Sequence, residues 1–468
     1  MTSTTDRNRW AALYVLCAGM LMIVLDATIV NVALPSIQDD LGFTASGLAW
    51  VVNAYLIAFG GLLLLAGRLG DLIGQRRVFL TGLVVFTAAS LLCAVAQTQE
   101  MLIAARFVQG IGGALTSAVV LGMIVTMFPQ PGEQAKALGV YGFVASAGGS
   151  IGLLAGGVLT DLISWNWIFF INLPIGVATG VLALRLIEPR PGIGVEAGAD
   201  LRGAALLIVG VMLGVYTILG ITEHGWTSDR TLGLGGIAAV LLVAFVARQG
   251  RVANPLMPLR LFRSRSVTGS NLVMAMLVVG LFGLFFLGAL YLQRILGYSP
   301  LEVGLAFLPS TVMMGVVSLR VAHRFAPRTA LVPALALIAA GLLLFARTPV
   351  DGTFLIDILP ATLLIGLGAG LSTPALMTLA MEGVKPEDSG LASGLVNTTV
   401  QVGGAIGLAV LATLASERTG DATSAAAVNS GYHLAYLIGA GALGAAVVVA
   451  LVLLRPARAR AAALAYAG

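Results

Sequence analysis

An aspartate, Asp26, stands inside an apolar stretch that runs from about residue 10 to residue 33. The stretch has the length of a membrane-spanning helix, which needs about 20 apolar residues. A charged side chain there costs roughly 2.5–3.5 kcal/mol even on the mildest insertion scales, and such residues usually mark transport pathways. Desolvation favours the neutral carboxyl, whereas a nearby cation favours the carboxylate. Asp26 therefore has the chemistry of a proton-carrying group.

The cation expected to modulate Asp26 is Arg106, in a helix predicted over 101–127. Arginine stays protonated in proteins, so it must face protein or water rather than lipid. Counting 1.5 Å per residue from the helix ends places the two charges at comparable depth. The alternative is a static salt bridge that only holds the helices together. Helical spacing puts the other polar and small residues of this helix on the face of Arg106: Gln109, Gly110, Gly113 and Ser117.

A second charged cluster lies in the segment GRLGDLIGQRRVFL, residues 67–80, expected as a loop between the second and third helices. Its glycines permit tight backbone turns. An acid among arginines can join two helix ends through ion pairs that break when the helices move. The alternative is an ordinary basic loop with a capping aspartate. The residues of this predicted cytoplasmic gating motif are Gly67, Gly70, Asp71, Gly74, Arg76 and Arg77.

Small residues recur in the helix predicted over 138–160, and they allow two helix backbones to approach closely. Close packing without a functional role is the alternative. These helix-packing residues are Gly149, Gly152, Gly156 and Gly157.

Neutral polar side chains form a further group. In the helix predicted over 390–415, Asn397 and Gln401 share a face and either line a cavity or bond to a neighbouring helix. Together with Asn31 and Gln109 they are the candidate residues of a substrate cavity.

These residues require a scaffold inside a membrane. The chain has 468 residues, of which 58% are hydrophobic and 10% charged, whereas soluble domains carry about 25% charged residues. Each apolar span must be a helix, because lipid offers no partner to free backbone groups. The sequence predicts an all-α polytopic membrane protein with fourteen spans, at about 10–33, 47–67, 78–96, 101–127, 138–160, 167–187, 202–221, 231–247, 268–291, 302–319, 330–346, 355–380, 390–415 and 433–454.

The basic residues divide unevenly between the two sides of these spans. Of the 26 Lys and Arg residues, 21 fall at the N-terminus or in every second loop and four in the opposite loops. The positive-inside rule then predicts that both termini are cytoplasmic. Two groups of six helices, 10–187 and 268–455, flank a middle part, 188–267, with linkers and two additional helices expected at the periphery. Parallel six-helix repeats around a central site are a common transporter architecture.

Other classes of protein find little support. The two cysteines lie in apolar runs and the three histidines are isolated, so neither a disulfide framework nor a metal site is expected. The basic residues lie in loops between spans, so no nucleic-acid partner is expected. The sequence has no nucleotide-binding loop and no Ser/His/Asp grouping for a membrane enzyme. It also lacks the large extramembrane domain of a receptor.

The segment GRLGDLIGQRR resembles the signature loop of the major facilitator superfamily. Five further segments, in order along nearly the whole chain, resemble those of its fourteen-helix drug:proton antiporter family. They are LDATIVNVALPSI (25–37), WVVNAYL (50–56), RFVQGIGGA (106–114), WNWIFFINLPIG (165–176) and SGLVNTTVQVGGAIGLAVLATL (393–414). One departure is GLLAGG (152–157), where Leu153 replaces the proline of a family pattern associated with antiport.

The resemblance implies the major facilitator fold and proton-coupled efflux of small hydrophobic or cationic compounds across the cytoplasmic membrane by alternating access. Asp26 and Arg106 would couple transport to the proton, which serves as coupling ion without a cofactor or metal. We expect a protein that works as a monomer in the lipid membrane, binds small molecules and is not an enzyme. The alternative is a dedicated exporter or importer of one metabolite, such as a self-made antibiotic.

Overall fold

The computed structural model describes residues 4–454, apart from 195, 197, 254, 383, 385–388, 421 and 423. The side chains of some further helical residues, most of them in α5, are not described. The described part of the chain consists of helices and connecting turns and contains no strand.

The elements follow one another along the chain with short connections. The first group is α1 (Thr4–Leu41), α2 (Ala45–Ile73), α3 (Gln75–Ala94), α4 (Gln99–Met127), α5 (Pro131–Leu162), α6 (Trp167–Phe170) and α7 (Asn172–Leu186). The middle group is α8 (Leu201–Leu219), α9 (Ile221–His224), α10 (Asp229–Gln249) and the 3-10 turn η2 (Leu259–Arg263). The last group is α11 (Arg265–Leu290), η3 (Tyr291–Ile295), α12 (Pro300–Arg320), η4 (Ala322–Arg324), α13 (Pro327–Phe345), η5 (Phe354–Ile358), α14 (Leu359–Met381), α15 (Ser389–Thr419) and α16 (Ala425–Leu453).

Within the described residues, 13 helices are long and apolar enough to cross a membrane. The remaining predicted span is α5, which is 32 residues long. The all-helical membrane fold predicted from the apolar runs is therefore confirmed, and the chain is a multipass membrane protein.

Several helices extend beyond the spans that the apolar runs predict. α1 continues past Pro35 to Leu41, eight residues beyond the predicted end at 33. α16 begins at Ala425 rather than 433, because the Ser424 side chain accepts a hydrogen bond from the Ala427 N–H at 3.3 Å and caps the helix there. The helix can continue into the polar interface, whereas an apolar run only reports the part within hydrocarbon.

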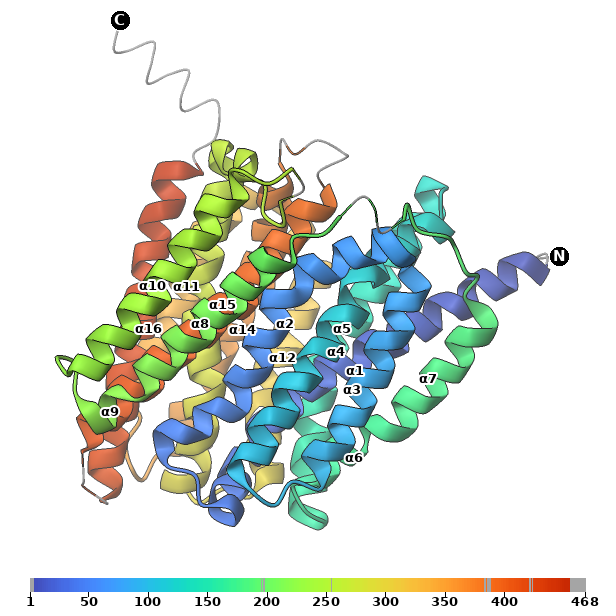
Figure 1. The fold of residues 1–468 in the computed structure, drawn as a ribbon. Coiled ribbons are helices and arrows are strands. Elements are labelled where there is room, and N and C mark those ends of the chain that lie inside the picture. The colour runs from blue at the N-terminus through green and yellow to red at the C-terminus, as the bar shows by residue number, and fades with distance from the viewer. Residues whose placement is uncertain are drawn as a thin grey trace, which may run out of the picture.

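The first and last groups of helices lie side by side (Figure 1). In this view α1–α5 occupy mainly one side, and the yellow-to-red helices lie mainly on the other. α2 packs along α15, and α5 packs along α12. The outermost position belongs to α10, which packs mainly on α8 and leaves side chains such as Val240 and Val243 exposed. α8 itself packs on both α2 and α15. The domain boundaries at 187/188 and 267/268 stay a prediction.

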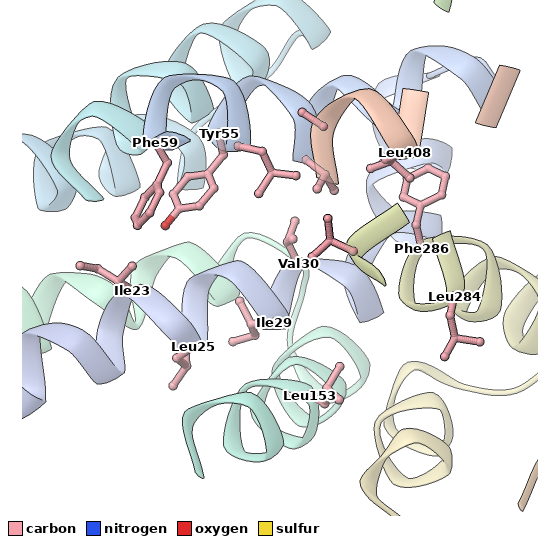
Figure 2. Packing of buried hydrophobic residues seen from close by; sticks show 14 of the residues in the cluster. Ile23, Leu25, Ile29, Val30, Tyr55, Phe59, Leu153, Leu284, Phe286 and Leu408 are labelled. Atoms are coloured by element: carbon pink, nitrogen blue, oxygen red, sulfur yellow. The ribbon is translucent and has the colours of Figure 1, made fainter. Parts of the chain in front are cut away.

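The buried core joins the helices that surround the candidate site. Figure 2 shows Ile23 projecting from α1 to the side of Tyr55 and Phe59 of α2, while Leu25 projects to the opposite side. All of these side chains are buried or nearly so. One face of α1 therefore packs toward α2 and the opposite face packs away from it. The face on which a polar residue of α1 lies decides which helices it can contact.

Candidate functional site

Asp26 is the centre of a buried polar network formed by α1, α4 and α7. Its Oδ2 accepts a hydrogen bond from Arg106 Nη1 at 2.6 Å. Its Oδ1 accepts from Gln109 Nε2 at 2.7 Å and from Asn172 Nδ2 at 2.9 Å. All four side chains are at most 1% exposed. The Asp26 carboxylate is therefore paired with a cation and saturated with donors, as a charge buried in protein must be.

Arg106 is held in place by further contacts. Its Nε donates to the Val51 carbonyl at 3.0 Å, and its Nη1 donates to Gln109 Oε1 at 2.6 Å. Its guanidinium carbon lies 4.4 Å from the centroid of the Tyr55 ring and 5.7 Å from that of Phe169. Arg106 and Gln109 point the same way because residues three apart share a face of a helix. The sequence placed Asp26 and Arg106 at comparable depth, and the structure brings them into direct contact; their role in proton coupling stays a prediction.

Sequence reasoning missed two members of this network, Asn172 and Ser90. Ser90 accepts from Gln109 Nε2 at 2.8 Å and from Asn172 Nδ2 at 3.3 Å. The available signal for Asn172 was an amide side chain in the apolar segment WNWIFFINLPIG, since a polar residue in a membrane span needs a partner.

A cavity of about 1220 Å³ lies between the first and last groups of helices. Its inner lining comes from α1, α2, α4, α5 and α15 and includes Ala27, Thr28 and Tyr55. The lining continues to Asp71 and Arg260, which are exposed at the end of the bundle that carries the linkers 187–200 and 250–264. Most of the Lys and Arg residues of the interhelical loops are assigned to this end. We call this the basic end. The cavity therefore opens at the basic end.

The opposite end is closed by contacts between α1 and the residues that follow α11. The Gln293 side chain donates to the Val32 carbonyl at 2.8 Å, and Arg294 donates to the Pro35 carbonyl at 3.3 Å. Arg294 also forms an ion pair with Asp39. These contacts link the first and last helix groups on the side away from the cavity opening.

Two of the four candidate cavity residues line this space. Asn397 and Gln401 project from α15 into the lining. Gln109 is fully buried in the Asp26 network, and Asn31 donates its amide to the Ala27 and Thr28 carbonyls of its own helix at 3.3 Å. We therefore correct the assignment of Asn31 and Gln109 to the cavity in this conformation. The rotation of α1 and α4, which a single helix pattern does not determine, is the reason.

The predicted loop over residues 67–80 is largely helical, which corrects the expectation of turns at Gly67 and Gly70. α2 continues through both glycines to Ile73. Gly70 allows the close approach of α2 to Val119 of α4, because an added Cβ would lie 2.5 Å from the Val119 Cγ1. Only Gly74, with a φ of +101°, makes the turn into α3. An added Cβ at Gly74 would also lie 2.6 Å from the Arg190 carbonyl oxygen.

Arg76 and Asp71 of this motif both bond to other segments of the chain in this conformation. Arg76 Nη2 donates to the Leu184 carbonyl of α7 at 2.6 Å. The Asp71 carbonyl accepts from the Ile193 N–H at 2.9 Å, so the linker that follows α7 is fixed to the end of α2. Among the described residues, neither Arg76 nor Arg77 forms an ion pair with Asp71. The gating role of Gly67, Gly70, Asp71, Gly74, Arg76 and Arg77 stays a prediction.

The glycines of α5 mark where this helix meets two partners. An added Cβ at Gly152 would lie 3.0 Å from the Leu25 carbonyl oxygen of α1, and one at Gly156 would lie 2.7 Å from that of Ile29. One at Gly157 would lie 2.7 Å from the Leu301 Cα of α12. Gly149 differs, since an added Cβ there meets no described atom within 4 Å. Leu153, in place of the family's proline, is buried and lies within an unbroken helix.

A buried cluster at the cavity opening holds α8, α10 and the segment after α10 together. Asp200 accepts from the Gly203 N–H at 2.9 Å, from Arg248 Nε at 2.7 Å and from Gln249 Nε2 at 2.9 Å. Gln249 Oε1 in turn accepts from the Met257 N–H at 3.0 Å. Burial raises the pKa of the Asp200 carboxyl, but these hydrogen bonds outweigh it and hold the pKa below its usual value.

Membrane-spanning helices around a cavity that opens at one end, beside a buried ion pair, define the class of polytopic membrane transporters. The family model described as the Major Facilitator Superfamily matches residues 16–408. The chain belongs to this family, whose members are transporters that bind small molecules within the membrane.

Curated relatives extend the comparison. The chain is 41% identical over 407 residues to the puromycin resistance protein of Streptomyces alboniger, covering 86% of this chain and 80% of that protein. It is 39% identical over 419 residues to the cephamycin export protein of Amycolatopsis lactamdurans, covering 86% of this chain and 85% of that protein. It is 34% identical over 415 residues to the tetracenomycin C resistance and export protein of Streptomyces glaucescens, covering 88% and 77%.

Solved structures share the fold at low sequence identity. A bacterial homologue of the human lysosomal transporter Spinster, in an inward-facing and unoccupied conformation, gives a TM-score of 0.68 at 15% identity, covering 96% of this chain and 98% of that one. The POT family transporter PepTSo gives 0.69 at 16% identity, covering 95% and 97%. These likenesses support the major facilitator fold.

Proposed function

We propose that this protein exports small hydrophobic or cationic compounds, antibiotics among them, from the cytoplasm in exchange for protons. The observation that carries the proposal is the cavity that opens at the basic end. Tyr55, which lines this cavity, also contacts Arg106 of the buried Asp26–Arg106 pair. The relatives named for antibiotic resistance and export support the direction of transport. No cofactor takes part apart from the coupling proton, and the protein acts as a monomer without enzymatic activity.

The proton cycle uses the two opposing influences on Asp26. Burial favours the neutral carboxyl, and Arg106 favours the carboxylate. When the helices move and the cavity opens to the other side, the balance changes, so Asp26 takes up a proton from outside and releases it inside. One charge crossing 100 mV is worth about 2.3 kcal/mol. At about 1.4 kcal/mol per tenfold, this supports a gradient of roughly 40-fold for an uncharged substrate.

The basic end faces the cytoplasm in this proposal, with both termini inside and the protein in the cytoplasmic membrane. The support is the excess of Lys and Arg at that end. Single cysteines at Ser164 and Ser424 should react with an impermeant thiol reagent on intact cells, and one at Gln130 should not. The native Cys17 and Cys93 are buried, so background labelling is low. Labelling of Gln130→Cys alone would reverse the orientation.

Export itself is tested in everted membrane vesicles with a panel of chemically different compounds, with and without a proton gradient. Gradient-dependent accumulation of several compounds is expected. A dedicated exporter of one antibiotic is the second candidate, favoured by relatives that are each named for a single antibiotic. It predicts that only one chemical type accumulates. Accumulation in right-side-out vesicles would instead indicate an importer.

A further inference from the structure

We propose that the cavity selects uncharged amphipathic molecules and discriminates against permanent cations. This inference rests on the proposed function and narrows it, because it restricts the exported compounds to uncharged ones and leaves out the permanent cations. It starts from the charged residues available to the cavity. In the described helices, Asp26 and Arg106 are the only Asp, Glu, Lys or Arg residues that stand more than five residues from either end of their helix.

The only such carboxylate does not serve as a counter-ion for a substrate. Asp26 is 0% exposed, and its charge is matched by Arg106 at 2.6 Å. Ala27 and Ile23 of α1 line the cavity, whereas Asp26 is fully buried and is not part of the lining. Tyr55 stands between, with one face of its ring near Arg106 and its side chain in the cavity lining. A cation in the cavity would therefore be separated by the Tyr55 ring from the Asp26–Arg106 ion pair, whose net charge is zero.

Among the described residues, the charged side chains of the lining lie only at its opening. Arg68 is thirteen residues along α2 from Tyr55, a distance of about 20 Å at the helical rise. In the part of the chain that the structure describes, the charged side chains of the lining at the opening are Arg68, Asp71 and Arg260. The stretch of α5 between Lys136 and Asp161 contains no Asp, Glu, Lys or Arg in the sequence, which covers its undescribed side chains as well. The interior therefore offers a cation no carboxylate to replace its lost hydration.

The hydrogen-bonding groups of the interior are neutral. Asn397 and Gln401 contribute amides, and Ser117 and Ser393 contribute hydroxyls. The Tyr55 hydroxyl is buried and has no hydrogen-bond partner in the part of the chain that the structure describes. Buried polar atoms are normally paired, so this hydroxyl is a ready partner for a substrate. Most of the other side chains of the interior lining are apolar, which suits a molecule with a hydrophobic body and a few uncharged polar groups.

A neutral substrate has a consequence for energetics. Exchange of one proton for an uncharged molecule moves one positive charge inward, so the membrane potential alone can drive export. Exchange of one proton for a monovalent cation would move no net charge, and the potential would have no effect. The charge of the substrate therefore determines whether the membrane potential affects the rate and extent of transport, which can be measured.

The test uses three probes that share a dansyl fluorophore and differ in charge. They are the dansyl amide of ethanolamine (neutral), that of aminoethyl-trimethylammonium (cationic) and that of glycine (anionic). Binding is followed by the rise in dansyl fluorescence on addition of full-length protein in nanodiscs, with empty nanodiscs as reference. We expect the neutral probe to bind at least tenfold more tightly than either charged probe, a difference of about 1.4 kcal/mol. Equal or tighter binding of the cation, or no binding of the neutral probe, overturns the proposal.

A gain of function sharpens the result. Asn397→Asp places a carboxylate in the cavity and should raise the affinity for the cationic probe several-fold. If Asn397→Asp does not fold, Gln401→Glu is the second variant for the same test. Gln97→Glu adds the same charge at an exposed site outside the cavity and should change nothing. If Asn397→Asp and Gln401→Glu both fold and neither improves cation binding, the lack of a carboxylate is not what excludes cations.

Transport separates this inference from the proposed function. In proteoliposomes, a potassium diffusion potential without a pH difference should drive movement of the neutral probe. If no probe moves under the membrane potential or under a pH gradient, the proposed export function is wrong. The order of the three binding affinities still decides the charge preference of the cavity. If the cation moves and the neutral probe does not, export stands and the present inference is wrong.

Discussion

The Tyr55 ring separates the cavity from the buried ion pair: its centroid lies 4.4 Å from the Arg106 guanidinium carbon, and the same side chain lines the cavity. A cation over an aromatic face is attracted by about 2 kcal/mol when both are desolvated. Tyr55 thus stabilises Arg106 and also excludes the cavity water from it. We expect this double contact to connect substrate occupancy with the charge state of Asp26 across a single side chain.

Removal of the ring should uncouple the transporter. Tyr55→Ala would expose Arg106 and Asp26 to the cavity and is expected to admit protons without substrate. Tyr55→Phe keeps the ring and removes only the hydroxyl, so it should preserve coupling and weaken binding of polar neutral compounds. The measurement is proton entry into proteoliposomes without substrate, read by an internal pH dye. Equal leak from the Ala and Phe variants would show that the ring does not act as a barrier.

Asp26→Asn should abolish export against a gradient, because an amide cannot take up and release a proton. Accumulation by everted vesicles at 100 mV is expected to fall from as much as about 40-fold to none. Exchange of substrate down its own gradient should persist. Asp161→Asn, at the exposed end of α5, is the matched control. Uphill export equal to that of the parent protein, with unchanged proton flux, would show that Asp26 is structural.

Gly157→Ala should disfavour the conformation closed at the end opposite the cavity opening. The added Cβ would lie 2.7 Å from the Leu301 Cα and 2.8 Å from the Pro300 carbonyl oxygen, both backbone atoms, so α5 and α12 must separate. A cysteine at Ser117 in the cavity reports this, and we expect slower labelling from the basic end. Gly149→Ala, which meets no described atom within 4 Å, should label like the parent.

The Asp39–Arg294 ion pair should hold the same end closed. Exposed ion pairs are worth about 0.2–1 kcal/mol, so Arg294→Ala should shift the conformational equilibrium by up to about fivefold. Spin labels at Gln97 and Ser424 measure the separation at this end, and the population with longer distances should grow. Exchange of the two charges, Asp39→Arg with Arg294→Asp, should restore the parent distribution. An unchanged distribution in Arg294→Ala would assign closure to the Gln293–Val32 contact.

Asp200→Asn should loosen the segment after α10 that borders the cavity opening. The pKa of Asp200 is lower in the folded protein than its usual value, so its stabilisation is complete above about pH 4 and is lost as the pH falls through the folded pKa. At pH 7 the variant should lose about 1–3 kcal/mol of stability. Thermal unfolding and trypsin cleavage at Arg251 measure this, with the exposed Asp229→Asn as control. A difference from the parent that grows below pH 4 would contradict the assignment.

The residues that carry the site were identified largely from sequence. An acid in an apolar run is expensive in lipid wherever the helix lies, so Asp26 stands out without any structure. The helical fold followed in the same way, because hydrocarbon leaves no other conformation for an apolar span. The side-to-side charge asymmetry and the order of motifs along the chain are also properties of the sequence alone.

The tertiary structure alone decided which side chains meet. The sequence predicts Gln109 in the cavity and does not single out Asn172 or Ser90. In the structure Gln109 and Asn172 both donate to Asp26, and Ser90 accepts from both. Gly70 looked like a turn, but its missing side chain serves the close approach of α2 to Val119 within a continuous helix. A helical pattern shows which residues share a face, and only packing between helices determines what that face contacts. For this transporter, the sequence by itself determined the charges and the helices, and helix packing determined that the ion pair lies behind Tyr55 rather than in the cavity.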